Sequence, residues 1–328
     1  MSYNLNGLST YTDQMEFPLV HQTLFENRIS KLVTQQAGVK SQVAINLIST
    51  DLQFQSQTCG NGSLYVGSGS VTLTQRYLTP GFIQAGEILC APALNNYYLA
   101  YQLKPGSYQE EVPFEQQLSQ YYVGLLQQQI EISLFNGNTA STTNNLSYFN
   151  GWVTNISSSL GGGLGTTGYV SASVHYSASS GSPVTSSNVV NIINGVYSAI
   201  PPALLQSPEK PVVMVGWDVY NTYIMALQAL YPLSLFNFPA NDGRITIPGT
   251  AVDVMAFVGL NYSSGNTNYS ILAGQPSNFI QGNDLEDDAA SFKFIYNPYS
   301  DNIQWKSKFT LAANVARPYE IVWGFNGQ

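Results

Sequence analysis

The stretch Glu110–Asn138, EEVPFEQQLSQYYVGLLQQQIEISLFNGN, predicts the longest helix in the chain. Acidic residues at its start suit the positive end of a helix dipole, and Asn136-Gly137 is a typical helix stop. Between these ends an apolar stripe recurs at helical spacing, at Phe114, Leu118, Tyr121, Tyr122, Leu125, Leu126, Gln129, Ile132 and Phe135. A helix of about 24 residues would be about 36 Å long, since each residue adds about 1.5 Å.

Two different periodicities precede this helix. Thr12 or Asp13 could cap an N-terminal helix that extends to about Ala37 and is stopped by Gly38. From Val43 onward the apolar residues alternate instead, which is the periodicity of a strand. The sequence therefore predicts a helical arm followed by β structure.

The β structure has the pattern of a long hairpin. A turn is indicated at Cys59–Gly62, and Ser63–Leu78 predicts the returning strand. Most side chains of this hairpin are small and polar. The hairpin has too few large apolar side chains to form the core of a compact domain by itself. We therefore expect the hairpin to lie on another surface.

Beyond the long helix, residues 137–186 are rich in Gly, Ser, Thr and Asn, which predicts loop or weakly ordered sheet. A helix is expected over Val189–Ile200, a buried strand over Pro211–Val215, and a second helix from an Asp218 N-cap to Tyr231. Further strands are predicted at Arg244–Ile247, Val252–Leu260, Phe292–Tyr296, Ile303–Ala313 and Tyr319–Phe325. The fold class is therefore α+β.

The composition indicates extensive contact with other protein surfaces. Charged residues make up only 9% of the chain, against roughly 25% in ordinary soluble proteins, and there are 22 Tyr. Aromatic residues are enriched at protein interfaces, where Lys, Glu and Asp are depleted. The net charge of −8 and the lack of a basic run disfavour sequence-specific nucleic-acid binding. Neither a signal peptide nor a membrane-spanning stretch is predicted.

Motifs for chemistry are weak. The Gly-x-Gly-x-x-Gly at Gly163–Gly168 lacks the preceding strand and following helix that a nucleotide site needs. His21 and His175 have no evident Cys or carboxylate companion, and Cys59 and Cys90 are expected to be reduced structural thiols.

Two groups of carboxylates have structural explanations. The first provides charge at a helix N-terminus, and the second lacks the spacing of a calcium loop and is expected to be an acidic turn. The groups are Glu110, Glu111 and Glu115, and Asp284, Glu286, Asp287 and Asp288. No catalytic, cofactor-binding or metal-binding residue is assigned, no cofactor is expected, and we do not expect an enzyme.

The order of these elements resembles that of the major capsid proteins of tailed double-stranded DNA phages, which have the Hong Kong 97-like fold. The resemblance is carried by EISLFNGN (Glu131–Asn138), LSYFNGWVTNI (Leu146–Ile156) and PVVMVGWDVYNTYIMAL (Pro211–Leu227). Three C-terminal segments are also similar, RITIPGTAVDVMAFVGL (Arg244–Leu260), NFIQGNDLEDD (Asn278–Asp288) and WKSKFTLAANVARPYEIVWG (Trp305–Gly324).

The resemblance implies four parts. Residues 1–42 would be an N-terminal arm and 43–104 an extended loop, the β hairpin. Residues 105–190 with 290–328 would form a peripheral domain that contains the long spine helix, and 191–289 an axial domain. In this family each extended loop lies over a neighbouring subunit, which would explain why the hairpin lacks its own core.

The resemblance also implies function and partners. The chain would self-assemble as pentamers and hexamers into an icosahedral head shell, a virion component made in the host bacterial cytoplasm. Portal, scaffolding and decoration proteins would be further partners, and packaged double-stranded DNA would be contacted non-specifically. Proteolytic removal of an N-terminal scaffold and Lys-Asn crosslinking are not expected. No charged coiled-coil prefix precedes the arm, and no lysine lies between Ser41 and Leu103.

Two alternatives remain open. An encapsulin-type compartment shares this fold but encloses cargo enzymes. A β-rich extracellular adhesin or carbohydrate-binding module, a different class, would also fit the Tyr, Asn, Gly and Ser content.

Overall fold

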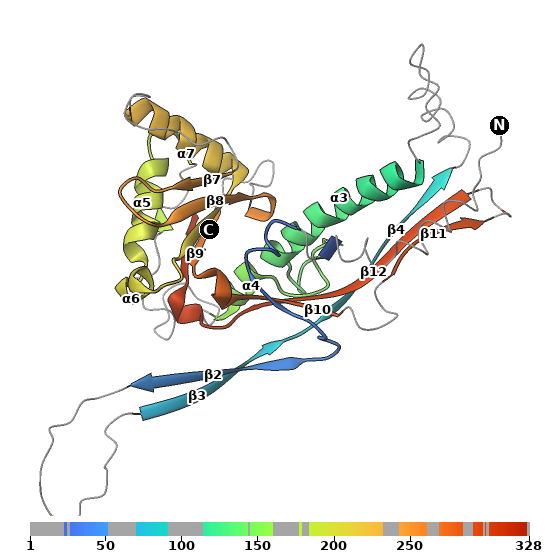
Figure 1. Cartoon of the computed structure of the whole chain (residues 1–328), viewed down its shortest axis with the longest axis horizontal. Helices are drawn as coiled ribbons and strands as arrows, with labels where there is room; N and C mark the ends of the chain where they lie inside the picture. The colour runs from blue at the N-terminus through green and yellow to red at the C-terminus, as the bar shows by residue number, and fades with distance from the viewer. Residues whose placement is uncertain are drawn as a thin grey trace, which may run out of the picture.

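The computed structural model describes residues 23–24, 27–51, 70–90, 114–143, 145–159, 177–178, 184–231, 243–260, 269–284, 291–297, 299 and 302–326. These residues form two mixed α/β units, each built on one sheet, and a separate two-stranded ribbon (Figure 1). Helices and sheets both contribute to each unit, as the predicted α+β class requires.

The first unit, called here the five-stranded unit, is centred on one long strand. Strand β12 pairs with β11 along its first half and β10 along its second, while β4 pairs along its other side, all antiparallel. Strand β1 adds to β10 in parallel. The strands are β1 (Thr34–Gln36), β4 (Gly81–Cys90), β10 (Phe279–Asp284), β11 (Ser291–Asn297) and β12 (Asn302–Val315).

Helices α3 (Phe114–Asn136) and α4 (Trp152–Ser159) cover one face of this sheet. The buried positions of α3 include Tyr122, Leu126, Ile130 and Leu134, each four residues from the next, so they form one helix face. Tyr122 stacks on Trp305 of β12 with 4.2 Å between ring centroids. Side chains at alternate positions of β12 face α3, because successive residues of a strand point to opposite sides.

The second unit, called here the six-stranded unit, has the strand order β5-β13-β9-β6-β8-β7. Its strands are β5 (Ser177–Ala178), β6 (Val212–Gly216), β7 (Arg244–Thr246), β8 (Asp253–Phe257), β9 (Ser270–Gly274) and β13 (Val322–Asn326). Helices α5 (Val189–Ala199), α6 (Pro202–Gln206) and α7 (Trp217–Leu230) belong to it. Every residue of β6 is buried, as expected for a central strand.

Three short 3₁₀ helices lie near the boundary between the units. They are η2 (Val258–Leu260), η3 (Pro276–Asn278) and η4 (Pro318–Glu320). The first directly follows β8, the second connects β9 to β10, and the third connects β12 to β13.

The ribbon consists of β2 (Val43–Asp51) and β3 (Ser70–Leu78), paired in antiparallel fashion along nine residues. It projects away from both sheets (Figure 1). These two strands confirm the predicted hairpin, although its turn at Cys59–Gly62 lies outside the described residues.

The predicted N-terminal helix is wrong in its described C-terminal part. Residues 27–33 form turns, and Thr34–Gln36 form β1, which pairs with β10 some 246 positions further along the chain (Thr34 with Ile280). The ladder with a distant strand outweighs local helix propensity here. Strand β1 ends at Gln36, before the predicted stop, and Gly38 follows with a φ of 73°, a backbone conformation that favours glycine.

The long helix is confirmed, but the predicted stripe is wrong at three positions. Tyr121 and Leu125 are 63% and 42% exposed, and Gln129 is exposed as well. The buried face of α3 instead contains Tyr122, Leu126, Ile130 and Leu134, because only one side of the helix packs against the sheet. Helix α4 is also a correction, since it lies inside the region 137–186 that was expected to be loop or sheet.

In the six-stranded unit, the helix over Val189–Ile200, the strand over Pro211–Val215 and the helix ending near Tyr231 are confirmed as α5, β6 and α7. The predicted N-cap Asp218 is wrong by two positions. Gly216 is the N-cap, and the Asp218 carboxylate accepts the Val219 N–H in the first turn at 2.8 Å. The five later predicted strands are confirmed as β7, β8, β11, β12 and β13 with shifted ends. Strands β4, β9 and β10 were not predicted.

Candidate assembly surfaces

One side of the ribbon is an exposed apolar surface. Alternation places every second side chain of each strand on the same side, and all eight residues on this side are exposed. Four are large and apolar: Ile48, Val71, Leu73 and Tyr77, with exposed fractions of 63%, 66%, 73% and 51%. We call Ala44, Ile48, Val71, Leu73 and Tyr77 the ribbon face. The hydrogen-bonded pair Asn46–Gln75 lies between Tyr77 and the other three large apolar residues. Isolated exposed apolar residues are common, but several on one side of a ribbon mark a site of interaction.

The base of the ribbon is fixed to the five-stranded unit. On the side opposite the ribbon face, Leu78 is fully buried against Val39 and Ala312. Asn314 of β12 donates from Nδ2 to the Tyr77 carbonyl at 2.6 Å and accepts from the Arg76 guanidinium at 3.2 Å. The ribbon is therefore fixed to the subunit at a defined point. Its buried apolar contacts lie near this base.

A second exposed surface lies on the side of the five-stranded sheet opposite α3. Phe82, Ile88 and Ile295 are 68%, 68% and 50% exposed there. The same side carries Lys306 and Lys308 of β12 and Lys293 of β11, and Lys293 is directly opposite Lys306 in the ladder. We call these six residues the open sheet face. Apolar residues beside lysines can bind a protein surface that is partly apolar and partly acidic.

A groove of about 430 Å³ lies on the α3 side, beside β4. Ile83, Ala85, Leu126, Ile130, Trp305 and Phe309 are among its lining residues. The Tyr122 hydroxyl donates to the Glu87 carboxylate at 2.9 Å. Burial is the main cause of the raised pKa of Tyr122, and the Glu87 carboxylate raises it further. Tyr122 is therefore a neutral donor throughout the physiological range.

Comparisons with known proteins agree with this architecture. No protein-family model matches the chain, and no curated protein matches it. Among solved structures, a chain of the procapsid of satellite phage P4 superposes with a TM-score of 0.60 at 12% identity, covering 94% of this chain and 90% of that chain. The capsid of a native GTA particle gives 0.53 at 9% identity over 94% and 91%, and the capsid of Ralstonia phage GP4 gives 0.51 at 11% identity over 90% and 87%. The chain has a phage capsid fold.

A phage capsid fold was expected from the sequence, and the similarity extends over nearly the whole chain and nearly the whole of each matched chain. Sequence reasoning missed the open sheet face. Its residues belong to β4, β11 and β12. Only the pairing of these strands brings them to the same side of one sheet.

Most residues considered for chemistry lie outside the described residues: Gly163–Gly168, His21, His175, Cys59, Glu110, Glu111, Glu286, Asp287 and Asp288. Of the others, Cys90 ends β4, Glu115 lies in the first turn of α3, and Asp284 ends β10 and is 3% exposed. Within the described part of the chain there is no group of three or more His, Cys, Asp or Glu that could hold a metal ion. No described helix is long and apolar enough to cross a membrane.

Proposed function

We propose that this chain is the major capsid protein of a tailed double-stranded DNA bacteriophage and self-assembles into the icosahedral head shell. The observation that carries the proposal is the ribbon face, a row of large apolar side chains that the subunit itself leaves exposed. Supporting it are the phage capsid fold and the low charge of the chain. The role is structural, and we propose no catalytic activity and no cofactor.

Within this proposal, the fold divides as in the Hong Kong 97-like family. The five-stranded unit with α3 as spine helix is the peripheral domain, the six-stranded unit is the axial domain, and the ribbon is the extended loop. Strand pairing suggests four adjustments to the predicted boundaries. Strand β4, within the expected extended loop 43–104, pairs in the five-stranded sheet. Strand β5, within the expected peripheral range 105–190, pairs in the six-stranded sheet. Strand β10, within the expected axial range 191–289, pairs in the five-stranded sheet. Strand β13, within the expected peripheral range 290–328, pairs in the six-stranded sheet.

The proposed partners follow from a closed shell. Copies of the chain associate as pentamers and hexamers through the ribbon face, which buries the exposed apolar side chains against a neighbour. The particle encloses DNA without reading its sequence and is assembled in the host cytoplasm. Portal, scaffolding and decoration proteins are further proposed partners, and the open sheet face is the surface proposed for the latter two.

Expression of the full chain followed by size-exclusion chromatography and negative-stain microscopy tests this proposal. We expect particles of uniform diameter, formed with or without helper proteins. A stable monomer that binds glycans would instead support an adhesin or carbohydrate-binding module. Particles that contain a bound cargo peptide and no DNA would support the encapsulin-type compartment.

A further inference from the structure

A buried carboxylate joins the two units at η2. Glu131 of α3 is 6% exposed, and its Oε1 accepts the backbone N–H groups of Val258 at 2.5 Å and Gly259 at 3.3 Å. One turn further along α3, the Asn136 side chain donates to the Gly259 carbonyl. Two side chains of the spine helix therefore bind both polar groups of a single peptide segment in the other unit.

The backbone of η2 also lies directly against α3. A Cβ atom at Gly259 would be 2.5 Å from Cδ2 of Phe135 and 2.6 Å from the carbonyl oxygen of Glu131, far inside contact distance. Only glycine fits at this position without moving the helix. Side-chain hydrogen bonds and close packing thus hold the same few residues.

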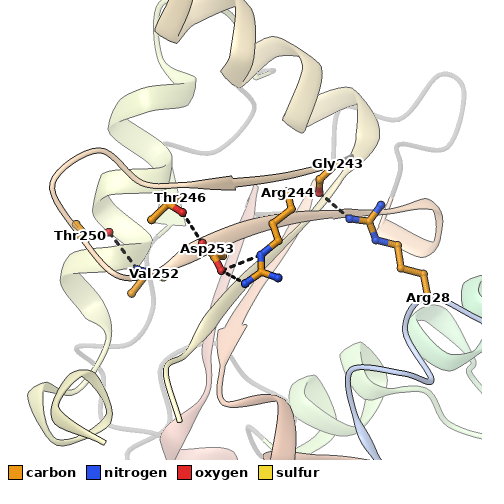
Figure 2. Close-up of polar contacts among 7 residues, drawn as sticks. All are labelled: Arg28, Gly243, Arg244, Thr246, Thr250, Val252 and Asp253. Atoms are coloured by element: carbon orange, nitrogen blue, oxygen red, sulfur yellow. Dashed lines mark hydrogen bonds and ion pairs between the residues drawn. The ribbon is translucent and has the colours of Figure 1, made fainter. Parts of the chain in front are cut away.

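Arg28, from the segment before β1, adds a third element to this junction. Its Nη2 donates to the Gly243 carbonyl at the start of β7 at 2.9 Å, a contact seen in Figure 2. Its guanidinium carbon is 5.7 Å from the centre of the Trp217 ring and 5.6 Å from that of Phe257, within the range of cation–π attraction. Arg28 therefore contacts the ends of β7, α7 and β8 at once.

The charges of Glu131 and Arg28 favour each other. Burial raises the pKa of the Glu131 carboxyl, while the two backbone N–H donors and the charge of Arg28 act in the opposite direction. A buried carboxylate is costly unless it is hydrogen-bonded and near a cation, and both conditions are met here.

A different set of contacts lies where the chain crosses between the units. The connections β9 to β10 and β12 to β13 run side by side and are joined by Asn278, which is 4% exposed. Its side chain donates to the Arg317 carbonyl at 2.8 Å and accepts the Arg317 N–H at 2.6 Å. Its own carbonyl accepts the Ala316 N–H at 2.9 Å. These bonds fix the two crossings to each other but not the angle between the sheets.

We propose that Glu131, Asn136 and Arg28 form a latch that sets the angle between the five-stranded and six-stranded units, with the Asn278–Arg317 crossing as the pivot. When the latch is removed, each unit keeps its own sheet, and the apolar cluster that the units share, which includes Phe135, Phe257 and Leu272, still joins them. The angle between the units then varies over a wider range. The latch is a property of the single subunit and holds whether or not the chain builds a shell.

Hydrogen exchange and a distance measurement on the full, unassembled chain test the latch. The variant is Glu131→Ala, and the matched control is Asp253→Ala. Asp253 is an acid whose bonds to Arg244 and Thr246 stay within the six-stranded unit (Figure 2). Spin labels at Met225 of α7 and Ile295 of β11, both exposed, report the distance between the units after Cys59 and Cys90 are replaced by Ser.

In Glu131→Ala we expect the amides of Val258 and Gly259 to exchange about tenfold faster, since each loses its buried acceptor. The distance distribution should broaden, while β6 and β12 keep their protection and Asp253→Ala keeps the narrow distribution. An unchanged distribution in Glu131→Ala would overturn the proposal. Faster exchange spread equally through β6 and β12 would do the same, since it would indicate general destabilisation.

Glu131→Gln keeps the proposal testable if the alanine variant does not fold. The amide retains one acceptor oxygen at the same place but loses the charge that faces Arg28. We expect the Val258 amide to remain protected and the distance distribution to stay close to that of the unaltered chain. A distribution as narrow in Arg28→Ala as in the unaltered chain would remove Arg28 from the latch.

Discussion

The ribbon face allows a sharp test, because two of its residues lie directly opposite each other. Ile48 pairs with Leu73 in the β2–β3 ladder, and they are 63% and 73% exposed. Two double variants differ only in polarity: Ile48→Val with Leu73→Val, and Ile48→Thr with Leu73→Thr. Valine and threonine have similar shape, and both favour strands, so the ribbon itself should be equally well formed in the two.

The expected difference lies in association. A hydroxyl buried without a partner costs about 1–3 kcal/mol, so the two threonines weaken each ribbon contact by about 2 kcal/mol or more. Since about 1.4 kcal/mol is tenfold in an equilibrium constant, the association constant should fall by about 30-fold per contact. The free energy of unfolding of the isolated subunit should differ by less than about 0.5 kcal/mol, because both positions are exposed in it.

Light scattering against subunit concentration, with negative-stain images of the products, measures the effect. The valine pair should form particles at a concentration close to that of the unaltered chain, and the threonine pair only at a much higher one or not at all. Particle formation at the same concentration by both pairs would refute the assignment of the ribbon face as an assembly surface. The unfolding measurements keep that result distinct from a folding defect.

Three other predictions concern the interior. Trp152→Phe removes the indole N–H that donates to backbone carbonyls of both β10 and β12, and should lower the free energy of unfolding by about 1–3 kcal/mol in urea titrations. The raised pKa of Glu131 means that its contribution to stability is fully present below about pH 4.5 and is lost as the pH rises through the folded pKa. The unaltered chain should therefore lose stability relative to Glu131→Gln over that window, whereas parallel pH curves would contradict this. Gly259→Ala should cost about 1–3 kcal/mol by overpacking against α3, and a thermal midpoint equal to that of the unaltered chain would count against the close contact.

Long, strongly periodic segments were predictable from the sequence. The helix Phe114–Asn136 and the central strand of the six-stranded sheet have patterns that extend over enough residues to outweigh local exceptions. The ribbon strands were also predictable, since Val43–Asp51 and Ser70–Leu78 alternate in the expected way. The exposure of Ile48 and Leu73 is consistent with that alternation, since within the described residues both side chains are more than half exposed.

The errors have a common physical cause, which is pairing between distant parts of the chain. Thr34–Gln36 are polar and follow a helical pattern, yet they become a strand because β10 offers an open edge. Strand β4 contains Gly81 and Gly86 and is given strand structure by its ladder with β12. The junction at Glu131 was equally hidden, since a lone glutamate on a helix is usually solvated and only the fold brings Val258 and Gly259 to it.

The way the chain threads between the two sheets also limits how the protein can fold during synthesis. Strand β12 completes the sheet that begins with residues near Thr34, and β13 pairs with β9 in the other sheet. Neither sheet is complete until residues 302–326 have left the ribosome. Pairings of this sequence separation form slowly, so the emerging chain must remain unaggregated while β4, β5 and β11 still lack their partner strands. Chaperones, or other copies of the chain, would therefore first meet it with these three strand edges open.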